Sequence, residues 1–131
     1  MGTAREPLSA WLRVRRGQLI RHLAVGASVD EAIGAEFTAV AGRPPVGETY
    51  RGRADVTVLW FRGDVGADLG ALLERVAAVT RELIWLFTPA APVAGFVGEP
   101  HLLAAARRAE LFAELDVLRR GPWIGARLHL G

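Results

Sequence analysis

One segment near the middle of the chain, residues 55–61, constrains the fold more than any other. It reads D-V-T-V-L-W-F, so β-branched and aromatic residues follow one another almost without a polar break. Such a run is typical of a strand covered on both faces, as in a parallel sheet flanked by helices. The segment stops at Arg62, and Asp64 follows two residues later. Residues 83–87 form a second run of this kind, which ends at Thr88 and a proline.

The residues before this central strand predict a strand and a helix. Residues 18–25 form an apolar run, which we interpret as the first strand. Ser28 and Glu31 have the spacing of a capping box, in which a hydroxyl caps the helix and a carboxylate lies three residues later. Apolar residues follow at helical spacing, and Gly42 is expected to end the helix.

The second half of the chain continues the alternation. Asp64 is expected to cap a helix whose apolar stripe reaches Val76, and Pro100 is expected to open another. Residues 110–120 fit either an extension of that helix or a strand, because leucines recur at helical spacing while apolar residues also alternate. Residues 123–130 alternate between apolar and polar types, which predicts a half-buried strand at or near a sheet edge.

Strands that alternate with helices predict a mainly parallel sheet with right-handed crossovers. The last strand follows a short link and is expected to pair antiparallel. The length of 131 residues fits one domain. We therefore expect residues 1–131 to form a single small three-layer Rossmann-like α/β domain, with a mainly parallel sheet and an antiparallel C-terminal strand.

The charge composition argues against a strongly basic protein. All sixteen basic residues are arginine, and they face 14 acidic residues for a net charge of +2. The pI of about 10.3 is high because almost nothing titrates between histidine and arginine in a chain without lysine or cysteine. Arginines cluster at residues 13–16, 107–108 and 119–120. We interpret most of them as solvated surface, so nucleic-acid binding ranks last among the functions considered.

The sequence predicts neither membrane insertion nor export. The longest uncharged stretch, residues 83–98, is too short for a transmembrane helix and contains two prolines. Residues 1–5 lack the apolar core of a signal peptide, so a cytoplasmic location is expected. The three histidines are too scattered for a metal site, and with no cysteine and two serines the chain offers little material for covalent catalysis.

Three stretches resemble a family of short, mostly actinobacterial proteins known only as domain of unknown function 3052. Residues 55–62, D-V-T-V-L-W-F-R, are similar to the family's D-V-V-L-L-W-W-R strand, and residues 83–89 are similar to its I-W-L-L-T-P strand. Trp123, Gly125 and the R-L pair that begins at Arg127 match its closing W-x-G-x-R-L. The family supplies no established activity, and its length between the helix and the final tryptophan favours a strand at residues 110–120.

The order of elements also resembles the C-terminal half of a class I methyltransferase. A methyl donor would need a glycine-rich turn after the first strand, so that the backbone can approach the ligand. Residues 23–28, L-A-V-G-A-S, offer only one glycine, and no acidic residue follows a second strand in a position to hold a ribose. We therefore expect no cofactor.

Ligands of open α/β sheets bind beyond the carboxyl ends of the strands. This rule selects seven ligand-binding candidates, which are His22, Ser28, Arg62, Asp64, Thr88, Arg119 and Arg120. Arg62 could hold a carboxylate or phosphate with two hydrogen bonds, and its alternative role is an ion pair with Asp64. Glu48 and Tyr50 lie in a loop from which they could act as acid or base.

Three functions remain open, and catalytic residues are not assigned. The first is a non-catalytic interaction or regulatory module that associates with itself. The second is a small enzyme or binding protein for an anionic metabolite of a biosynthetic pathway, with Arg62 as its anchor. The third is nucleic-acid binding through the arginine clusters. The expected partners are therefore a second copy of the chain or an anionic small molecule. Neither a metal ion nor a membrane is expected as a partner.

Overall fold

The computed structural model describes residues 12–131. The strands are β1 (Ile20–Val25), β2 (Ala54–Phe61), β3 (Thr80–Pro89), β4 (Leu111–Arg120) and β5 (Trp123–Leu130). The helices are α2 (Glu31–Ala41), α3 (Leu69–Ala78) and α4 (Glu99–Arg108). The prediction of an α/β chain in which strands and helices alternate is confirmed.

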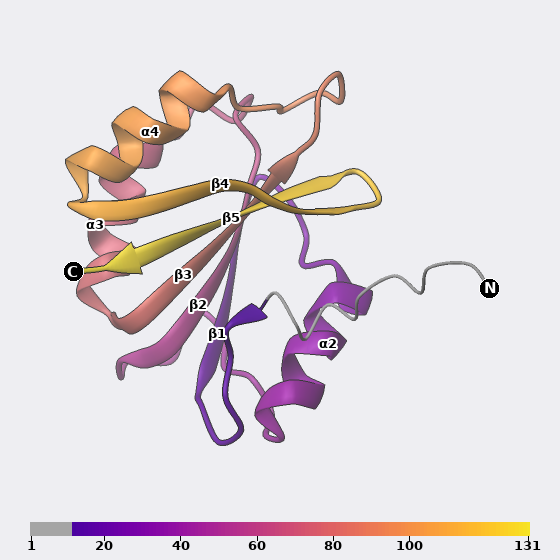
Figure 1. Cartoon of the computed structure of the whole chain (residues 1–131), viewed down its shortest axis with the longest axis vertical. Coiled ribbons are helices and arrows are strands. Elements are labelled where there is room, and N and C mark those ends of the chain that lie inside the picture. The colour runs from indigo at the N-terminus through magenta and orange to yellow at the C-terminus, as the bar shows by residue number, and fades with distance from the viewer. Residues whose placement is uncertain (1–11) are drawn as a thin grey trace.

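The named strands form one mixed sheet in the order β1-β2-β3-β5-β4 (Figure 1). β1, β2 and β3 are parallel to one another. β5 is antiparallel to both β3 and β4, so β4 runs in the same direction as β3. The expected antiparallel C-terminal strand is therefore confirmed. β5 lies one position inside the sheet, because β4 pairs outside it and forms the edge.

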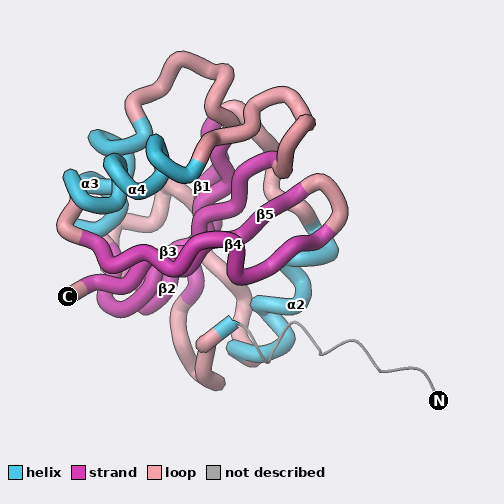
Figure 2. Tube along the Cα trace, turned by 45° about the horizontal axis from the view of Figure 1, so that its top comes forward, coloured by secondary structure: helices cyan, strands magenta, loops and turns pink. Residues whose placement is uncertain are grey.

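The helices lie on opposite sides of the sheet, α2 on one and α3 with α4 on the other (Figures 1 and 2). This arrangement divides the apolar core in two. Leu59, Leu86 and Leu128 face α3 and α4, whereas Trp60 and Trp85 face α2. The strands carry apolar residues on both faces because both faces are covered.

Residues 110–120 resolve as strand. Leu111–Arg120 pairs with β5 through a hairpin whose turn is Gly121 and Pro122. An irregularity between Glu114 and Leu118 shifts the register of this pairing. The family resemblance favoured this outcome, whereas helical propensity alone did not distinguish the two possibilities.

Two predicted helix caps are wrong. α2 is capped by Asp30, not Ser28, and the Asp30 carboxylate accepts hydrogen bonds from the N–H groups of residues 32 and 33. α3 is capped by Asp68, not Asp64. In both cases the chain leaves the strand through a longer loop, and a second aspartate nearer the helix takes the capping position. Gly42 ends α2 in the left-handed conformation, as predicted.

Aromatic rings form a continuous stack on the α2 face. Trp60 of β2 stacks on Phe87 of β3 with 4.7 Å between ring centroids, and Phe87 stacks on Trp85 at 5.5 Å. Phe37 of α2 meets both Trp85 and Phe87 edge to face. All four side chains are fully buried. Phe37 thus packs α2 against the sheet through this stack.

The closing W-x-G-x-R-L motif packs on the same stack. A Cβ added at Gly125 would lie 2.9 Å from the Phe87 ring and 3.1 Å from the Trp85 ring, so glycine is required by close approach. The guanidinium of Arg127 lies over the Trp85 ring at 5.8 Å. The Glu114 carboxylate accepts hydrogen bonds from Arg127 at 3.1 and 3.2 Å. The motif therefore supports the core.

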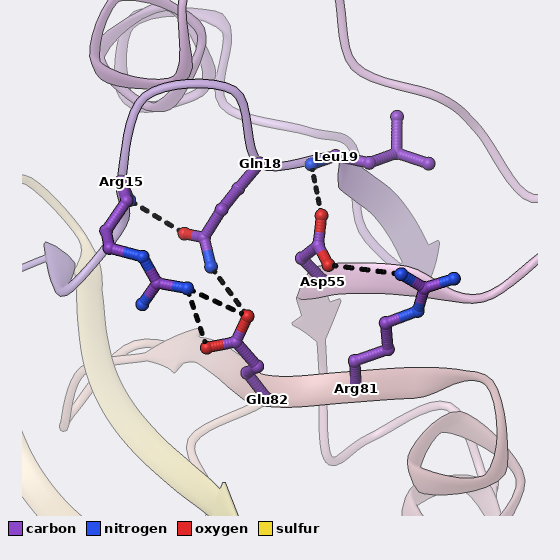
Figure 3. Close-up of polar contacts among 6 residues, drawn as sticks. All are labelled: Arg15, Gln18, Leu19, Asp55, Arg81 and Glu82. Carbon is purple, nitrogen blue, oxygen red and sulfur yellow. Dashed lines mark hydrogen bonds and ion pairs between the residues drawn. The ribbon is translucent and has the colours of Figure 1, made fainter.

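Polar side chains join the amino ends of the strands (Figure 3). The Glu82 carboxylate accepts hydrogen bonds from Arg15 at 3.1 Å and from Gln18 at 2.9 Å. The Asp55 carboxylate accepts one from the N–H of Leu19 at 2.7 Å. Because these contacts hold the segment before β1 against β2 and β3, this end of the sheet is structural.

A short bridge continues the sheet beyond β1. Val46, which follows α2, pairs parallel with Arg21 of β1. It donates a hydrogen bond to the Ile20 carbonyl at 2.8 Å and accepts one from the N–H of His22 at 2.9 Å. The chain thus returns from α2 to the outer side of β1 before it enters β2.

The contact of Gly125 with the aromatic stack gives a first prediction. Gly125→Ala is expected to lower the free energy of unfolding by about 1–3 kcal/mol, because the rings must shift to admit a methyl group. Gly47→Ala is the control, since nothing lies within 4 Å of an added Cβ there, and it should change stability by less than about 0.5 kcal/mol. Urea denaturation of both variants measures the difference, and equal stabilities would contradict the packing described.

Candidate functional site

A pocket lies where the strands end, on the α2 side of the sheet. Its volume is about 350 Å³. Its lining comes from the segments after β1 and β2, the end of β3, the following loop and the β4–β5 turn, and consists of Ala27, Ser28, Asp30, Arg62, Pro89, Val93, Ala94, Pro122 and Trp123. We call it the α2-side pocket. It occupies the carboxyl end of the parallel strands, where the topology rule places ligands.

A second, smaller space lies at the same end on the other face. This α4-side cavity has a volume of about 140 Å³. Side chains of β3, β4, β5 and α4 surround it, together with the loop of residues 90–98. The same loop lines the α2-side pocket with Val93 and Ala94, and the α4-side cavity with Phe96 and Val97. Four of the seven predicted ligand residues line these spaces, Ser28 and Arg62 in the α2-side pocket and Thr88 and Arg119 in the α4-side cavity.

Arg62 lies in the α2-side pocket and is paired with Asp64. Its Nε and Nη2 donate hydrogen bonds to the two carboxylate oxygens at 3.1 and 2.7 Å. These hydrogen bonds hold the pKa of Asp64 below its usual value and raise the pKa of Arg62. Arg62 also packs on Gly95, because a Cβ added there would lie 3.0 Å from its Nε. The ion pair that was the alternative role of Arg62 is thus present.

Ser28 lines the α2-side pocket, but the start of α2 is already satisfied. Asp30 accepts hydrogen bonds from the N–H groups of Ala32 and Ile33 at 3.0 and 3.1 Å. An anion at this helix start would have to replace a carboxylate of the chain itself. Asp30, which the sequence analysis did not name as the cap, therefore occupies two of the N–H groups that an anion beside Ser28 would use. The sequence could have indicated Asp30 as the cap, because aspartate is as good a capping residue as serine.

His22 lies within β1, under α2, and is absent from the linings of both spaces. Its Nδ1 accepts a long hydrogen bond of 3.4 Å from Trp60 Nε1, and its ring extends the aromatic stack at 6.4 Å from Trp60. Burial lowers the pKa of His22. A neutral, packed imidazole fits a structural role.

The three predicted residues at the ends of β3 and β4 lie on different faces of the sheet. Thr88 and Arg119 line the α4-side cavity. Arg120 faces the other way and lies 3.8 Å from the Glu36 carboxylate of α2. Successive residues of a strand point to opposite faces, so the arginine pair cannot act on one ligand.

Glu48 and Tyr50 lie at the amino end of the sheet, in the segment that leads into β2. Arg21 donates hydrogen bonds to the backbone oxygens of Tyr50, at 3.1 Å, and of Gly52. Its guanidinium lies 5.5 Å from the Tyr50 ring centroid. Because ligands were expected at the carboxyl end, this placement separates both residues from the two spaces.

The arginine clusters do not form one surface. Arg15 pairs with Glu82 near the start of β3, whereas Arg119 and Arg120 end β4 at the opposite end of the sheet. The seven residue-to-residue steps from Glu82 to Pro89 span about 23 Å at the rise of a strand. Within residues 12–131, no group of three or more His, Cys, Asp or Glu side chains could hold a metal ion. No helix in that range is long and apolar enough to cross a membrane.

Comparison with known proteins supports both resemblances seen in the sequence. A family model described as "protein of unknown function (DUF3052)" matches residues 9–130. No curated protein has a significant sequence match. The fold is similar to magnesium protoporphyrin IX methyltransferase from Synechocystis PCC 6803 with bound SAM, at a TM-score of 0.52 and 10% identity, over 88% of this chain and 71% of that one. It is also similar to a methyltransferase from Pyrococcus furiosus, at a TM-score of 0.53 and 12% identity, over 93% and 80% of the two chains.

A methyl donor does not fit the turn after β1. Gly26 is left-handed there, with a φ of 71°, but the side chain of Val65 fills the space above it. A Cβ added at Gly26 would lie 2.0 Å from a Val65 methyl carbon. In dinucleotide-type sites a glycine lets the ligand come close to the backbone. Here the side chain of Val65 occupies that space.

The correction at α2 gives a second prediction. Asp30→Ala is expected to destabilise the protein by about 1 kcal/mol, because two N–H groups lose their acceptor. Ser28→Ala, two residues away in the same pocket, should change stability by less than about 0.5 kcal/mol. Thermal unfolding of the two variants at one pH measures this difference, and a larger loss for Ser28→Ala would restore the capping role predicted for serine.

Proposed function

Because the chain belongs to the family described as protein of unknown function (DUF3052), its membership assigns no activity, and we propose that it is a non-catalytic interaction module. In this proposal, one three-layer Rossmann-like domain with a methyltransferase-like fold binds partners in the cytoplasm and associates with itself.

The charged groups of the α2-side pocket already have partners within the chain, and this observation is the main support for a non-catalytic role. Asp30 is occupied by the amides of α2, and Arg62 by Asp64. Ser28 remains, but a hydroxyl needs an adjacent base to become a nucleophile. The filled space above Gly26 supports the same conclusion for methyl transfer.

The edge strand β4 supports self-association. Edge strands present unpaired backbone groups, and proteins usually keep large apolar side chains away from them. Phe112 of β4 is 72% exposed. A second copy that covers Phe112 would remove this apolar surface from water.

Two measurements test the proposal. Light scattering after gel filtration should give a mass above that of one chain, and Phe112→Ser should lower it. Leu103→Ser is the control, because Leu103 is an exposed apolar residue that belongs to α4 and not to the edge strand. Calorimetric titration with S-adenosylmethionine should show no binding. A strict monomer that binds the methyl donor would overturn the proposal.

An anionic metabolite bound by Arg62 is the second candidate. Among the described residues, the Arg62 guanidinium donates its hydrogen bonds to Asp64 through Nε and Nη2, and Nη1 has no hydrogen bond. The volume of the α2-side pocket, about 350 Å³, falls in the usual range of ligand sites. Trp123 and Pro89 would cover the apolar part of such a metabolite of a biosynthetic pathway.

A thermal-shift screen of anionic metabolites tests this candidate. A ligand at about 100 times its dissociation constant should stabilise the protein by about 2.7 kcal/mol. Arg62→Ala should abolish the shift, and Arg53→Ala, in an exposed loop at the other end of the sheet, should leave it unchanged. A shift that survives Arg62→Ala would exclude Arg62 as the anchor.

A further inference from the structure

His22 and Trp60 make a hydrogen bond beneath α2 that depends on the protonation state of the imidazole. We propose that His22 makes the α2-side pocket sensitive to pH, because a proton gained by its ring displaces the Trp60 indole and, through it, Trp123 in the wall of the pocket. This regulation goes beyond the proposed interaction function and does not depend on which partner or metabolite the pocket binds.

The hydrogen bond determines which nitrogen of His22 carries the proton. Trp60 Nε1 donates to His22 Nδ1 at 3.4 Å, so the neutral ring holds its proton on Nε2. An imidazolium carries a proton on both nitrogens. Protonation of His22 would therefore set two N–H groups against each other at this contact.

Trp60 cannot keep its position once this acceptor is lost. Its side chain is fully buried, and among the described residues His22 Nδ1 is the one acceptor of its indole N–H. A buried N–H group without a partner is costly, so the indole must turn toward another acceptor or toward water. Trp60 meets Trp123 edge to face, with 5.2 Å between ring centroids. Because Trp123 lines the α2-side pocket, a turn of Trp60 changes the shape of that pocket.

An open groove beside α2 gives the imidazole access to protons from the solvent. The groove has a volume of about 510 Å³, and its lining includes His22 of β1, residues of α2 and Pro45. The Nε2 side of the ring lies against α2, since a Cβ added at Gly34 would lie 3.8 Å from Nε2. The ring is thus buried enough to hold the indole and open enough to exchange its proton.

The groups around His22 favour its neutral form in the folded protein. Phe37 of α2 and Trp60 of β2 pack on the ring and carry no charge. Glu31 of α2 is the one other ionisable side chain among the described residues that line the groove, and no ion pair joins it to His22. Burial lowers the pKa of His22, whereas the unfolded chain takes up this proton at about pH 6.5. The folded state therefore loses stability as the pH falls below about 6.5, until His22 is protonated in the folded chain as well.

NMR spectroscopy of the full chain tests the proposal. At about pH 8, where the ring is neutral, the nitrogen shifts of His22 should show the proton on Nε2. During a titration to about pH 5, the indole N–H signals of Trp60 and Trp123 should shift with the same apparent pKa as the His22 ring, below about 6.5. The Trp85 indole is the internal control, because it donates to the backbone carbonyl of Leu12 at 2.8 Å. A carbonyl does not titrate, so the Trp85 signal should not follow His22.

Two histidine variants assign the effect. His22→Asn keeps an acceptor for the Trp60 indole, because the amide oxygen takes the place of Nδ1, but it does not titrate. The pH-dependent shifts of Trp60 and Trp123 should therefore disappear. The midpoint of thermal unfolding should also fall less between about pH 6.5 and 5 than in the unchanged chain. His101→Asn is the matched control, since His101 is an exposed histidine of α4, and both responses should persist in it.

Three results would overturn the proposal. They are a proton on Nδ1 of neutral His22, a Trp60 or Trp123 signal that does not follow the His22 ring, and shifts that persist in His22→Asn. The first two are measured on the unchanged chain, so they decide the question even where His22→Asn does not fold. Self-association is measured separately as a mass, so the failure of either proposal leaves the other standing.

Discussion

The stack of Trp60, Phe87 and Trp85 is the contact on which the rest of the structure depends. Centroid distances of 4.7 and 5.5 Å place the three rings in direct contact across β2 and β3. Since a shift of one residue would turn each ring to the opposite face, the stack fixes the register of both strands. The stack also leaves no room for a side chain at Gly125, and therefore fixes where β5 enters the sheet. The residues by which the family is recognised are thus mainly those that build its core.

The sequence predicted the elements that burial determines and missed those that depend on one local contact. The strands at residues 55–61 and 83–87 were evident because both faces of each are covered, which leaves a continuous apolar run. The caps were wrong because Asp30 and Asp68 compete with Ser28 and Asp64, and the loop geometry that decides between them is not encoded by spacing. Residues 110–120 remained open because their leucines satisfy two periodicities, and only pairing with β5 decides. In the site, the sequence located the carboxyl end but not its division into two spaces, because that division follows from which face each side chain takes.

The path of the chain after α2 follows from the handedness of crossovers. α2 and α3 cover opposite faces, while the steps from β1 to β2 and from β2 to β3 go the same way across the sheet. Direct connections would therefore give one left-handed crossover, which parallel sheets strongly disfavour. The bridge at Val46 resolves this conflict, since the chain first steps to the outer side of β1. Residues 47–53, which follow Val46, must then cross at the amino end of the sheet to reach β2. Arg21 anchors this segment at that end. Glu48 and Tyr50 therefore lie far from the carboxyl end.

The loop of residues 90–98 links the two spaces at that end. It is held by backbone hydrogen bonds from Gly63 to the Gly95 carbonyl, at 2.8 Å, and from Ala90 to the Pro122 carbonyl, at 2.7 Å. Arg62 packs on Gly95, so the pair with Asp64 positions the loop as well as neutralising the arginine. A ligand in either space would contact a loop that also forms a wall of the other. Ligands at two such spaces influence one another to the extent that each favours a particular loop conformation.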